Sequence, residues 1–309
     1  MKPLVGIVIP CHNAAEWIAR SVQSCLDQCN IKIEILVVDD GSTDKSIEVV
    51  ESFGNRVKWK SGPRQGACSA RNSGLRLAST EFILFLDADD YLESDSTNEW
   101  AVRCAEADLV LGPFAYEIRG CRTVAKFHKP GVTADSVVCQ WLEGSFTPSC
   151  SVLWRRSFLL AIGGWDVKAL RNQDGELTMR ALLNGARMAV ANRGLGVYVQ
   201  HQNANRVSKG RGQEVFASEL SSLDHLWCLA QTRRGVGMRE SFAKAFYRLA
   251  YDAFAAGIEE VGDLALSRAR KMGLKSHPGN LAHQTLAAVL GLRRKLQLTG
   301  LVKRRVEWV

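Results

Sequence analysis

The N-terminal part of the chain alternates short, wholly apolar runs with longer segments whose apolar residues recur at helical spacing. The apolar runs are Leu4 to Ile9, Ile33 to Val38 and Phe82 to Leu86. Runs of this length, bounded by polar residues, are typical of strands buried on both faces. The helical patterns between them extend from Trp17 to Cys29, from Ile47 to Phe53 and from Cys68 to Ala78. The alternation predicts a doubly wound α/β domain with a largely parallel central sheet.

Polar residues follow each of these strands at its end: Pro10-Cys11-His12-Asn13, Asp39-Asp40-Gly41-Ser42 and Asp87-Ala88-Asp89-Asp90. Ligands of such sheets bind at the carboxyl ends of the strands, so the three segments are expected to surround one crevice. Three acids at the end of one strand repel one another unless a cation joins them. Mg²⁺ or Mn²⁺ suits oxygen ligands and also carries phosphate oxygens of a substrate. By itself the third segment is more typical of a turn capped by Asp side chains, and the convergence of the three favours a binding site.

Two common phosphate-binding motifs are absent from the sequence. No Gly-x-Gly-x-x-Gly follows the first predicted strand, and no P-loop occurs anywhere in the chain. A dinucleotide cofactor and a Walker-type triphosphate site are therefore disfavoured.

The remainder of the chain carries two further candidate strands and then turns helical. The strands are Asp108 to Leu111 and Ser151 to Leu153, and a boundary is placed near Ser208. Beyond it, helical patterns cover Phe216 to Ala230, Phe242 to Ala256 and Leu281 to Leu298. We expect an α/β domain over residues 1–208 and a helical C-terminal region with a basic tail over residues 209–309.

Composition indicates a cytoplasmic protein. The nine cysteines include no Cys-x-x-Cys pair and lie mostly in apolar patterns, so we expect reduced core thiols. We expect no signal peptide and no membrane-spanning run. The formal charge of +8 is concentrated in the tail, where six of the last 19 residues are basic. Apolar residues are interleaved with these basic ones, at Leu292, Leu296, Val302 and Val306. The pattern predicts either a basic helix that lies on the cytoplasmic face of an anionic membrane or a solvated helix docked on the protein.

Several motifs in register resemble those of one family. They are Val5 to Asn13, Val37 to Asp44, Ala70-Arg71-Asn72-Ser73-Gly74, Phe85 to Asp90, Gly163-Gly164-Trp165-Asp166 and Gln173 to Arg180. In order and spacing they are similar to the signatures of family 2 glycosyltransferases, over roughly the first two thirds of the chain. The resemblance implies the GT-A fold, with residues 1–208 as the domain that binds a nucleotide-sugar and catalyses transfer.

The resemblance also implies roles for the strand-end residues. Asp89 is expected on a Mn²⁺ or Mg²⁺ ion that bridges the donor's phosphates, and Asp87 on the ribose or a metal-bound water. His201 resembles the histidine that closes over the metal or diphosphate, with solvation in a polar loop as the alternative. Asp90 is left as a turn or supporting acid, or a direct ligand.

Donor binding is predicted for a wider set of residues: Pro10, Cys11, Asn13, Asp39, Asp40, Arg64, Gly66, Arg71, Asp87 and Ala88. Asp39 is favoured over Asp40 for the hydrogen bond to the base, and the other acid is expected to cap the next helix. Arg64 is either a base- or phosphate-binding residue or a solvated one. Arg71 is expected to hold the carboxylate cluster together. His12 is expected to pack over the nucleotide.

Asp174 is the expected general base, which takes the proton of an acceptor hydroxyl in a single inverting displacement. Glu176 is the alternative if the register differs by two. The family usually has Glu before this aspartate, whereas this chain has Gln173. Gln173 and Trp165 are predicted on the acceptor side, although Trp165 is equally suited to packing beneath its turn.

The sequence therefore predicts a metal-dependent inverting glycosyltransferase that uses a nucleotide-diphosphate donor, most simply a UDP-sugar. The expected partner is a saccharide or lipid-linked saccharide acceptor, as in bacterial surface polysaccharide assembly, and no nucleic acid. The alternatives are a nucleotidyltransferase that makes the sugar nucleotide, and a noncatalytic protein that binds nucleotide-sugars.

Overall fold

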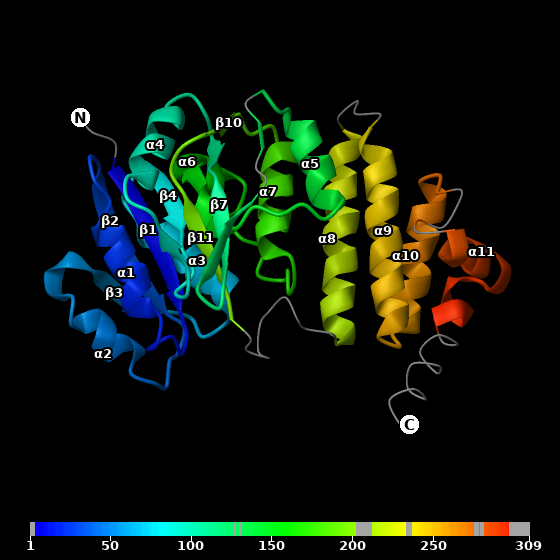
Figure 1. Ribbon diagram of the computed structural model, residues 1–309, viewed down its shortest axis with the longest axis horizontal. Coiled ribbons are helices and arrows are strands. Elements are labelled where there is room, and N and C mark those ends of the chain that lie inside the picture. The colour runs from blue at the N-terminus through cyan, green and yellow to red at the C-terminus, as the bar shows by residue number, and fades with distance from the viewer. Residues whose placement is uncertain are drawn as a thin grey trace. The chain divides into compact units, whose positions relative to one another are not determined.

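A computed structural model describes residues 4–125, 128–129, 131–201, 212–232, 237–274, 278 and 281–296. The chain forms two compact units (Figure 1). The first comprises Met1–Ala134, Phe146–Val167 and Gln173–Asn203, and the second Asp135–Ser145, Lys168–Asn172 and Ala204–Val309.

A seven-stranded sheet forms the centre of the first unit, in the order β10-β6-β9-β4-β1-β2-β3. Its strands are β1 (Leu4–Cys11), β2 (Lys32–Asp39), β3 (Lys58–Ser61), β4 (Phe82–Phe85), β6 (Leu109–Leu111), β9 (Val152–Arg155) and β10 (Met188–Val190). Only β9 runs antiparallel to its neighbours in this sheet. The expected α/β class with a largely parallel central sheet is confirmed.

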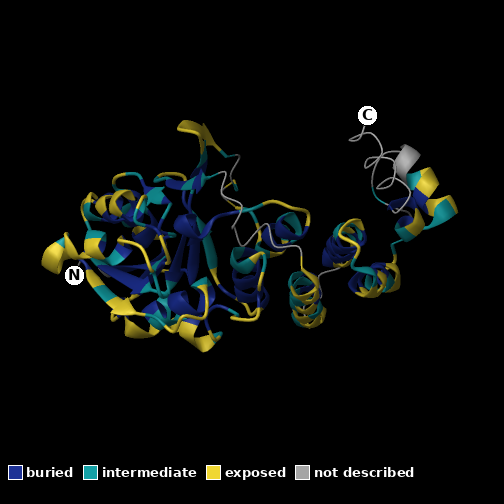
Figure 2. Ribbon diagram, turned by 90° about the horizontal axis from the view of Figure 1, so that it is seen from below, coloured by how far each residue is buried: buried dark blue, intermediate teal, exposed yellow. Residues whose placement is uncertain are grey.

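The centre of this sheet is the core of the unit. Val5, Ile7, Val8 and Ile9 of β1 are all fully buried, and Figure 2 shows the central strands in the colour of buried residues. Such burial on both faces explains why the strand sequences are continuously apolar.

Helices and short 3₁₀ turns connect these strands. They are α1 (Ile18–Leu26), α2 (Ser46–Glu51), η1 (Gly54–Arg56), α3 (Ala67–Leu77), α4 (Ser96–Arg103), η2 (Ser149–Ser151), α6 (Arg156–Ala161) and α7 (Gln173–Leu183). α3 packs so closely on β1 that a Cβ at Gly74 would lie 2.2 Å from Val8 Cγ1. Glycine at this position therefore sets the separation of helix and sheet.

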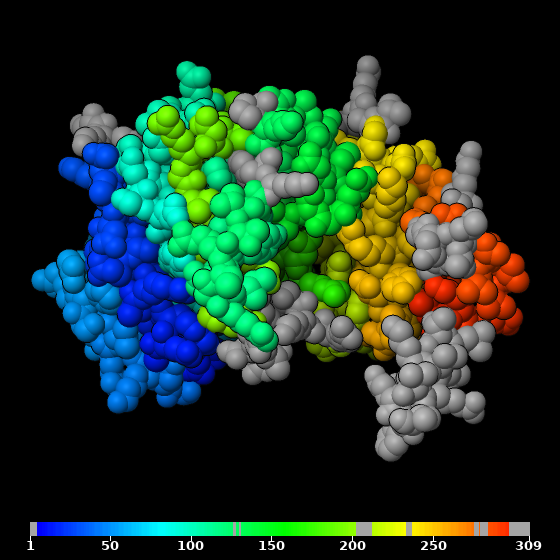
Figure 3. Space-filling view, in the orientation of Figure 1, coloured from blue at the N-terminus to red at the C-terminus, as the bar shows by residue number. Residues whose placement is uncertain are grey.

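A second sheet of four strands lies in the same unit, in the order β5-β11-β7-β8. Its strands are β5 (Tyr91–Leu92), β7 (Phe114–Ile118), β8 (Cys121–Val124) and β11 (Gly196–Gln200). β8 is exposed along its whole length, and the hairpin of β7 and β8 forms part of the surface seen in Figure 3. The sequence did not predict this sheet, because β5 has only two residues and the other three strands mix apolar with polar residues.

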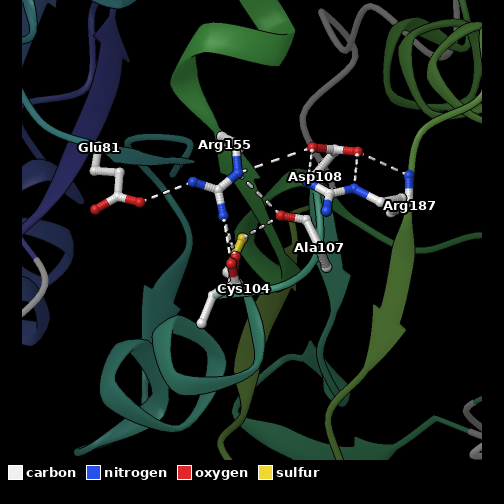
Figure 4. A network of polar contacts seen from close by, with 7 residues as sticks. Glu81, Cys104, Ala107, Asp108, Arg155 and Arg187 are labelled. Atoms are coloured by element: carbon white, nitrogen blue, oxygen red, sulfur yellow. Dashed lines mark hydrogen bonds and ion pairs between the residues drawn. The ribbon is translucent and has the colours of Figure 1, made fainter.

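A network of polar contacts links the segments at the amino ends of the parallel strands of the central sheet (Figure 4). Arg155, at the end of β9, donates to the carbonyl oxygens of Cys104 (2.6 Å) and Ala107 (3.2 Å) and pairs with Glu81 (2.7 Å). Asp108 accepts two hydrogen bonds from the Arg187 guanidinium at 3.0 Å. These charges are satisfied by one another at the edge opposite the strand-end acids, so they serve the fold.

The second unit is helical. Its helices are α5 (Ala134–Leu142), α8 (Gln213–Gln231), α9 (Met238–Ala255), α10 (Glu259–Lys271) and α11 (Leu281–Leu290). The Trp227 and Phe242 rings join α8 to α9, with centroids 5.2 Å apart. Gly262 allows the Phe254 ring to lie against α10, because a Cβ there would come within 2.5 Å of it.

The helical C-terminal region is therefore confirmed, and α10 is an addition to the helices that the sequence predicted. None of the described helices is long and apolar enough to cross a bilayer. Val302 and Val306 of the predicted basic tail lie outside the described residues, as does the predicted boundary near Ser208.

Candidate active site

The site begins where β1, β2 and β3 end side by side. Cys11 pairs in register with Asp39, and Asp39 with Ser61. The chain continues this alignment beyond the strands, because Asp40 N donates to Cys11 O (2.7 Å) and Gly62 N to Asp39 O (2.6 Å). The loops that carry the predicted donor-binding residues therefore leave the sheet at one edge.

The loops after β1 and β2 are bonded to each other through Asn13. Its side-chain oxygen accepts a hydrogen bond from Thr43 N (2.8 Å), and its own N–H donates to Ser42 Oγ (3.0 Å). Asn13 has φ of 49°, and α1 starts only at Ile18. Asn13 therefore does not cap α1, and its side chain instead joins two loops at the edge of the sheet.

Asp39 and Asp40 have different local partners. Asp40 accepts hydrogen bonds on both carboxylate oxygens, from Gln65 N (3.2 Å) and Gly66 N (2.7 Å). For Asp39 the structure gives one, from Ser42 N (3.0 Å) to Oδ1. Asp40 therefore anchors the loop before α3, and Asp39 is the better placed of the two for a ligand, although the preference remains a prediction.

The other predicted donor-binding residues line the same edge of the sheet. Cys11 is buried, and burial raises the pKa of its thiol, so it is a neutral packing group. His12 is exposed. Arg64 is exposed with φ of 57°, and its side chain lies over Gly41, at 3.0 Å from the position of a Cβ there. Pro10 lies within the paired part of β1, opposite Val38, and Gly66 with φ of 90° precedes α3.

Arg71 of α3 links the strand-end acids to α7. Its guanidinium is 2.5 Å from Asp87 Oδ1 and donates to Gln173 Oε1 at 3.3 Å, while it covers the Trp165 ring at 4.4 Å. Asp87 raises the pKa of Arg71 further above its ordinary value, despite the opposing effect of burial. Arg71 is therefore a permanently charged group at the centre of a carboxylate cluster.

The buried Trp165 ring does not match one of its two predicted roles. It is 3% exposed, with Arg71 on its face and Phe85 at 5.1 Å in an edge-on contact. The ring packs beneath its turn, which is the second of the two predicted roles. Its face is covered by Arg71, so it does not offer a surface to an acceptor sugar. Asn72, which the sequence analysis did not assign, holds this turn by two hydrogen bonds to the Trp165 backbone, at 2.8 and 2.9 Å.

The structure brings two predicted metal ligands together. His201 Nε2 lies 3.5 Å from Asp89 Oδ2, and the imidazole stacks on Trp17 with ring centroids 4.6 Å apart. Nε2 is buried and has no hydrogen-bond partner among the residues that the structure describes.

A carboxylate and an imidazole suit Mn²⁺, and a divalent cation at a phosphate site commonly has only one or two protein ligands. Within the described ranges, no three His, Cys, Asp or Glu side chains are grouped so as to hold a metal ion by themselves. The residues present therefore fit a cation that also binds the phosphates of a substrate.

Asp90 has a structural position. Its side chain is 1% exposed, and Oδ1 accepts a hydrogen bond from Val199 N of β11 at 2.8 Å. Burial, together with the neighbouring Asp89 and Asp87, raises the pKa of Asp90 well above its ordinary value. Asp90 thus ties the acidic loop to the strand that leads to His201.

Asp174 lies at the start of α7, partly buried, next to Gln173 and the Arg71 guanidinium. Burial raises the pKa of its carboxyl to about 7, against the lowering effect of Arg71 and with a further increase from Asp87. The backbone N–H of Ser149 donates a hydrogen bond to it. A carboxyl with this pKa exchanges protons readily at neutral pH, as a general base must.

The alternative base, Glu176, is already engaged. It is 3% exposed and accepts hydrogen bonds from Arg180 Nε (2.6 Å) and Nη2 (3.0 Å). Arg180 also donates to the carbonyl oxygens of Ile162 and Gly164. The pair supports the turn before Trp165, which leaves Asp174 as the acid available for proton transfer.

Two residues near the acids had no sequence signal. Arg20 of α1 donates to Asp89 O at 3.3 Å and pairs with Glu117 at 2.9 Å, which steadies the acidic loop from outside. Ser149 contributes only its backbone N–H to Asp174. Side-chain patterns do not reveal such contacts, because they depend on tertiary placement.

Comparison with known proteins assigns the family. Residues 6–159 match the family model of Glycosyl transferase family 2. An uncharacterized glycosyltransferase of Haemophilus influenzae is 42% identical over 97 residues, which are 30% of this chain and 39% of that protein. The putative glycosyltransferase EpsH of Bacillus subtilis is 34% identical over 143 residues, 45% of this chain and 39% of EpsH. The chondroitin synthase of Pasteurella multocida is 43% identical over 97 residues, 30% of this chain and 10% of the synthase.

A solved structure supports the fold over more of the chain. The crystal structure of residues 1–349 of Staphylococcus aureus TarS, in complex with UDP-GlcNAc, has a TM-score of 0.61 and 18% identity. The likeness covers 88% of this chain and 90% of that one. Fold and site together define an α/β protein of the GT-A type. The chain belongs to glycosyltransferase family 2, and its matches span less than half the length of the curated relatives named above.

Proposed function

We propose that this protein transfers a sugar from a nucleotide-diphosphate donor to a hydroxyl of a saccharide or lipid-linked saccharide acceptor, with inversion at the anomeric carbon. One arrangement carries the proposal: Arg71 joins Asp87 of the strand-end acids to Gln173, the neighbour of Asp174. The acids proposed to bind the donor and the residue proposed as the general base are therefore linked through Arg71. Family membership and the UDP-GlcNAc complex of TarS support a UDP-sugar as the donor.

The residues divide the reaction among them. Asp39 is proposed to accept a hydrogen bond from the base, and Asp87 to bind the ribose. Asp174 takes the proton of the acceptor hydroxyl, whose oxygen attacks the anomeric carbon as the bond to the diphosphate breaks on the opposite side. Because the bond forms and breaks in a single displacement, the configuration at the anomeric carbon inverts.

We propose that the reaction depends on a divalent metal ion and that Asp89 and His201 bind this ion. A divalent cation bound there would neutralise charge that develops on the leaving diphosphate. The orphaned His201 Nε2 beside Asp89 supports this assignment. The carboxylate and the phosphate oxygens of such a site suit either Mn²⁺ or Mg²⁺.

Asp89→Ala tests the metal and the transfer reaction together. We expect the wild-type chain with Mn²⁺ to release nucleoside diphosphate from a UDP-sugar. The variant should release it about 100-fold more slowly, because the cation loses its carboxylate. Asp27→Ala, an exposed change at the end of α1, is the control and should match the wild type. A variant with the wild-type rate and the wild-type response to Mn²⁺ would exclude the metal role of Asp89.

The pH dependence of the wild-type enzyme follows from Asp174. Only the carboxylate form accepts a proton, and the pKa of the carboxyl in the free protein is about 7. We expect kcat/KM to fall as the pH is lowered through about 7, with a plateau above it. Rates of nucleoside diphosphate release from about pH 5 to about pH 9 measure this. A plateau that extends to about pH 5 would be incompatible with a base of this pKa.

A further inference from the structure

Four aromatic side chains of the first unit form a continuous surface, here called the aromatic wall: Phe114 and Tyr116 of β7, Tyr198 of β11, and Phe146 of the segment before η2. The Phe146 ring lies 5.3 Å from that of Tyr198 and 6.0 Å from that of Phe114. Tyr116 lies 5.3 Å from Phe114 and 6.2 Å from Tyr198. All these pairs are edge-to-face contacts, a stable arrangement of rings.

The strand register shows which way the wall faces. β7 and β11 run side by side (Figure 1), with Gly196 opposite Phe114 and Tyr198 opposite Tyr116. A Cβ at Gly196 would lie 2.5 Å from Cys150 O and 2.3 Å from Ser151 Oγ. Because residues two apart on a strand share a face, Tyr198 also points to the side on which Phe146 to Ser151 lie.

This side of the sheet is also the side of the proposed base. Phe146 precedes Ser149 by three residues, and the Ser149 N–H is bonded to Asp174. The wall leads through β11 to His201, three residues after Tyr198. The segment with Phe146 continues through η2 into β9 of the central sheet. Strands β4 and β1 separate β9 from β2, which carries Asp39, the residue proposed to bind the nucleobase. The wall therefore contacts the segment that reaches the proposed general base, Asp174, and this segment is separated from β2 by two strands of the central sheet.

The wall is only partly covered by the described protein. Phe114 is buried, while Tyr116, Phe146 and Tyr198 are each partly exposed. No hydrogen bond joins the Tyr116 hydroxyl to another described residue, and burial raises the pKa of this phenol, so it stays protonated. The surface thus combines flat apolar rings with phenolic hydroxyls and carries no charge of its own.

We propose that the aromatic wall binds a pyranose ring of the saccharide acceptor and presents its hydroxyl to Asp174, an inference that rests on the proposed transfer function. The C–H face of a pyranose packs on aromatic rings, and its hydroxyl groups bond to phenols at the edge. A phosphate-bearing acceptor unit would need cations, and the four wall residues provide none. The acceptor unit that carries the reacting hydroxyl is therefore an uncharged sugar.

Binding of disaccharides tests the wall without requiring transfer. Saturation-transfer NMR is measured with cellobiose, lactose and N,N′-diacetylchitobiose on the full chain, with and without UDP. We expect at least one of them to receive saturation on its ring protons and to keep it when UDP fills the donor site. Loss of every sugar signal on addition of UDP would place the binding in the donor site and overturn the proposal, as would the lack of any signal.

Variants then locate the binding. Tyr116→Leu and Tyr198→Leu keep apolar volume but remove a ring, and each should weaken sugar binding about tenfold. Phe53→Leu, an aromatic change beside α2 and outside the wall, should leave it unchanged. Tyr116→Phe and Tyr198→Phe keep the rings and should retain most of the binding, so the proposal remains testable if a leucine variant fails to fold. Binding that persists at full strength in the folded leucine variants would contradict the wall.

This result is separable from the proposed function. A wild-type chain that binds disaccharides and releases no nucleoside diphosphate from any donor would remove the transfer reaction while leaving the wall as a sugar site. A chain that releases nucleoside diphosphate and transfers to sugars regardless of the wall variants would remove only the wall.

Discussion

Asp174→Asn is expected to lower the rate of sugar transfer by about 10³-fold, because general-base catalysis contributes roughly 10²- to 10⁴-fold. Asparagine has nearly the same shape, so the contacts of Arg71 with Asp87 and Gln173 should persist. Donor binding should remain close to that of the wild type, and the loss should appear in kcat. Transfer to a saccharide acceptor and donor affinity, measured on the same preparation, separate these effects.

A matched control is available in the same unit. Asp95→Asn makes the same chemical change before α4, at a position with φ of 66° that asparagine tolerates well. It should leave transfer and donor binding unchanged. Wild-type turnover in Asp174→Asn would refute the assignment of the base, and Glu176 is not a ready replacement because Arg180 occupies both of its oxygens.

Arg71→Gln is expected to destabilise the protein by about 3 kcal/mol, since removal of one partner leaves the other's charge without its cation. The Arg71 side chain is 6% exposed, and its guanidinium pairs with Asp87 and packs on Trp165. For a unit of this size, that loss corresponds to a melting temperature lower by about 10 °C. Thermal unfolding of the donor-free chain measures it.

Two comparisons make the Arg71 prediction specific. Arg76→Gln, an exposed change on the same helix, should leave the melting temperature nearly unchanged. Arg71→Lys keeps the charge but loses the planar fork, so it should fall between the wild type and the glutamine variant. A melting temperature of Arg71→Gln equal to that of Arg76→Gln would show that the ion pair with Asp87 does not stabilise the fold.

The loss of Arg71 should also alter the acid limb of the pH profile. Arg71 lowers the pKa of Asp174, so any folded Arg71→Gln protein should require a higher pH for full activity. An acid limb at the same pH in the variant would separate Arg71 from the tuning of the base.

Sequence patterns predicted the part of the fold that is locally encoded. The continuous apolar runs identified β1, β2 and β4, because strands buried on both faces need such runs. The acids that follow them were predicted to gather at one edge, and the structure does bring Asp87, Asp89 and His201 into one neighbourhood. The second sheet was missed, since β5 has two residues and β7 and β11 carry no continuous apolar run like that of β4.

Local sequence patterns could not predict the tertiary contacts that give similar residues different roles. Asp39 and Asp40 differ only in which backbone N–H groups reach them, and those come from different loops. Trp165 is buried because Arg71 and Phe85, distant in sequence, lie against it. The N–H of Ser149 contacts Asp174 through a turn that no side-chain motif marks.

The most direct test of the central claim is the melting temperature of the full chain with UDP-, GDP- and TDP-sugars, each with and without Mn²⁺. A ligand that binds only the folded state stabilises it by about 2.7 kcal/mol at 100 times its dissociation constant. We predict a clear increase with a UDP-sugar and Mn²⁺ together, a much smaller one without metal, and none with Mn²⁺ alone. No increase with any of these nucleotide-sugars in the presence of Mn²⁺ would contradict the account.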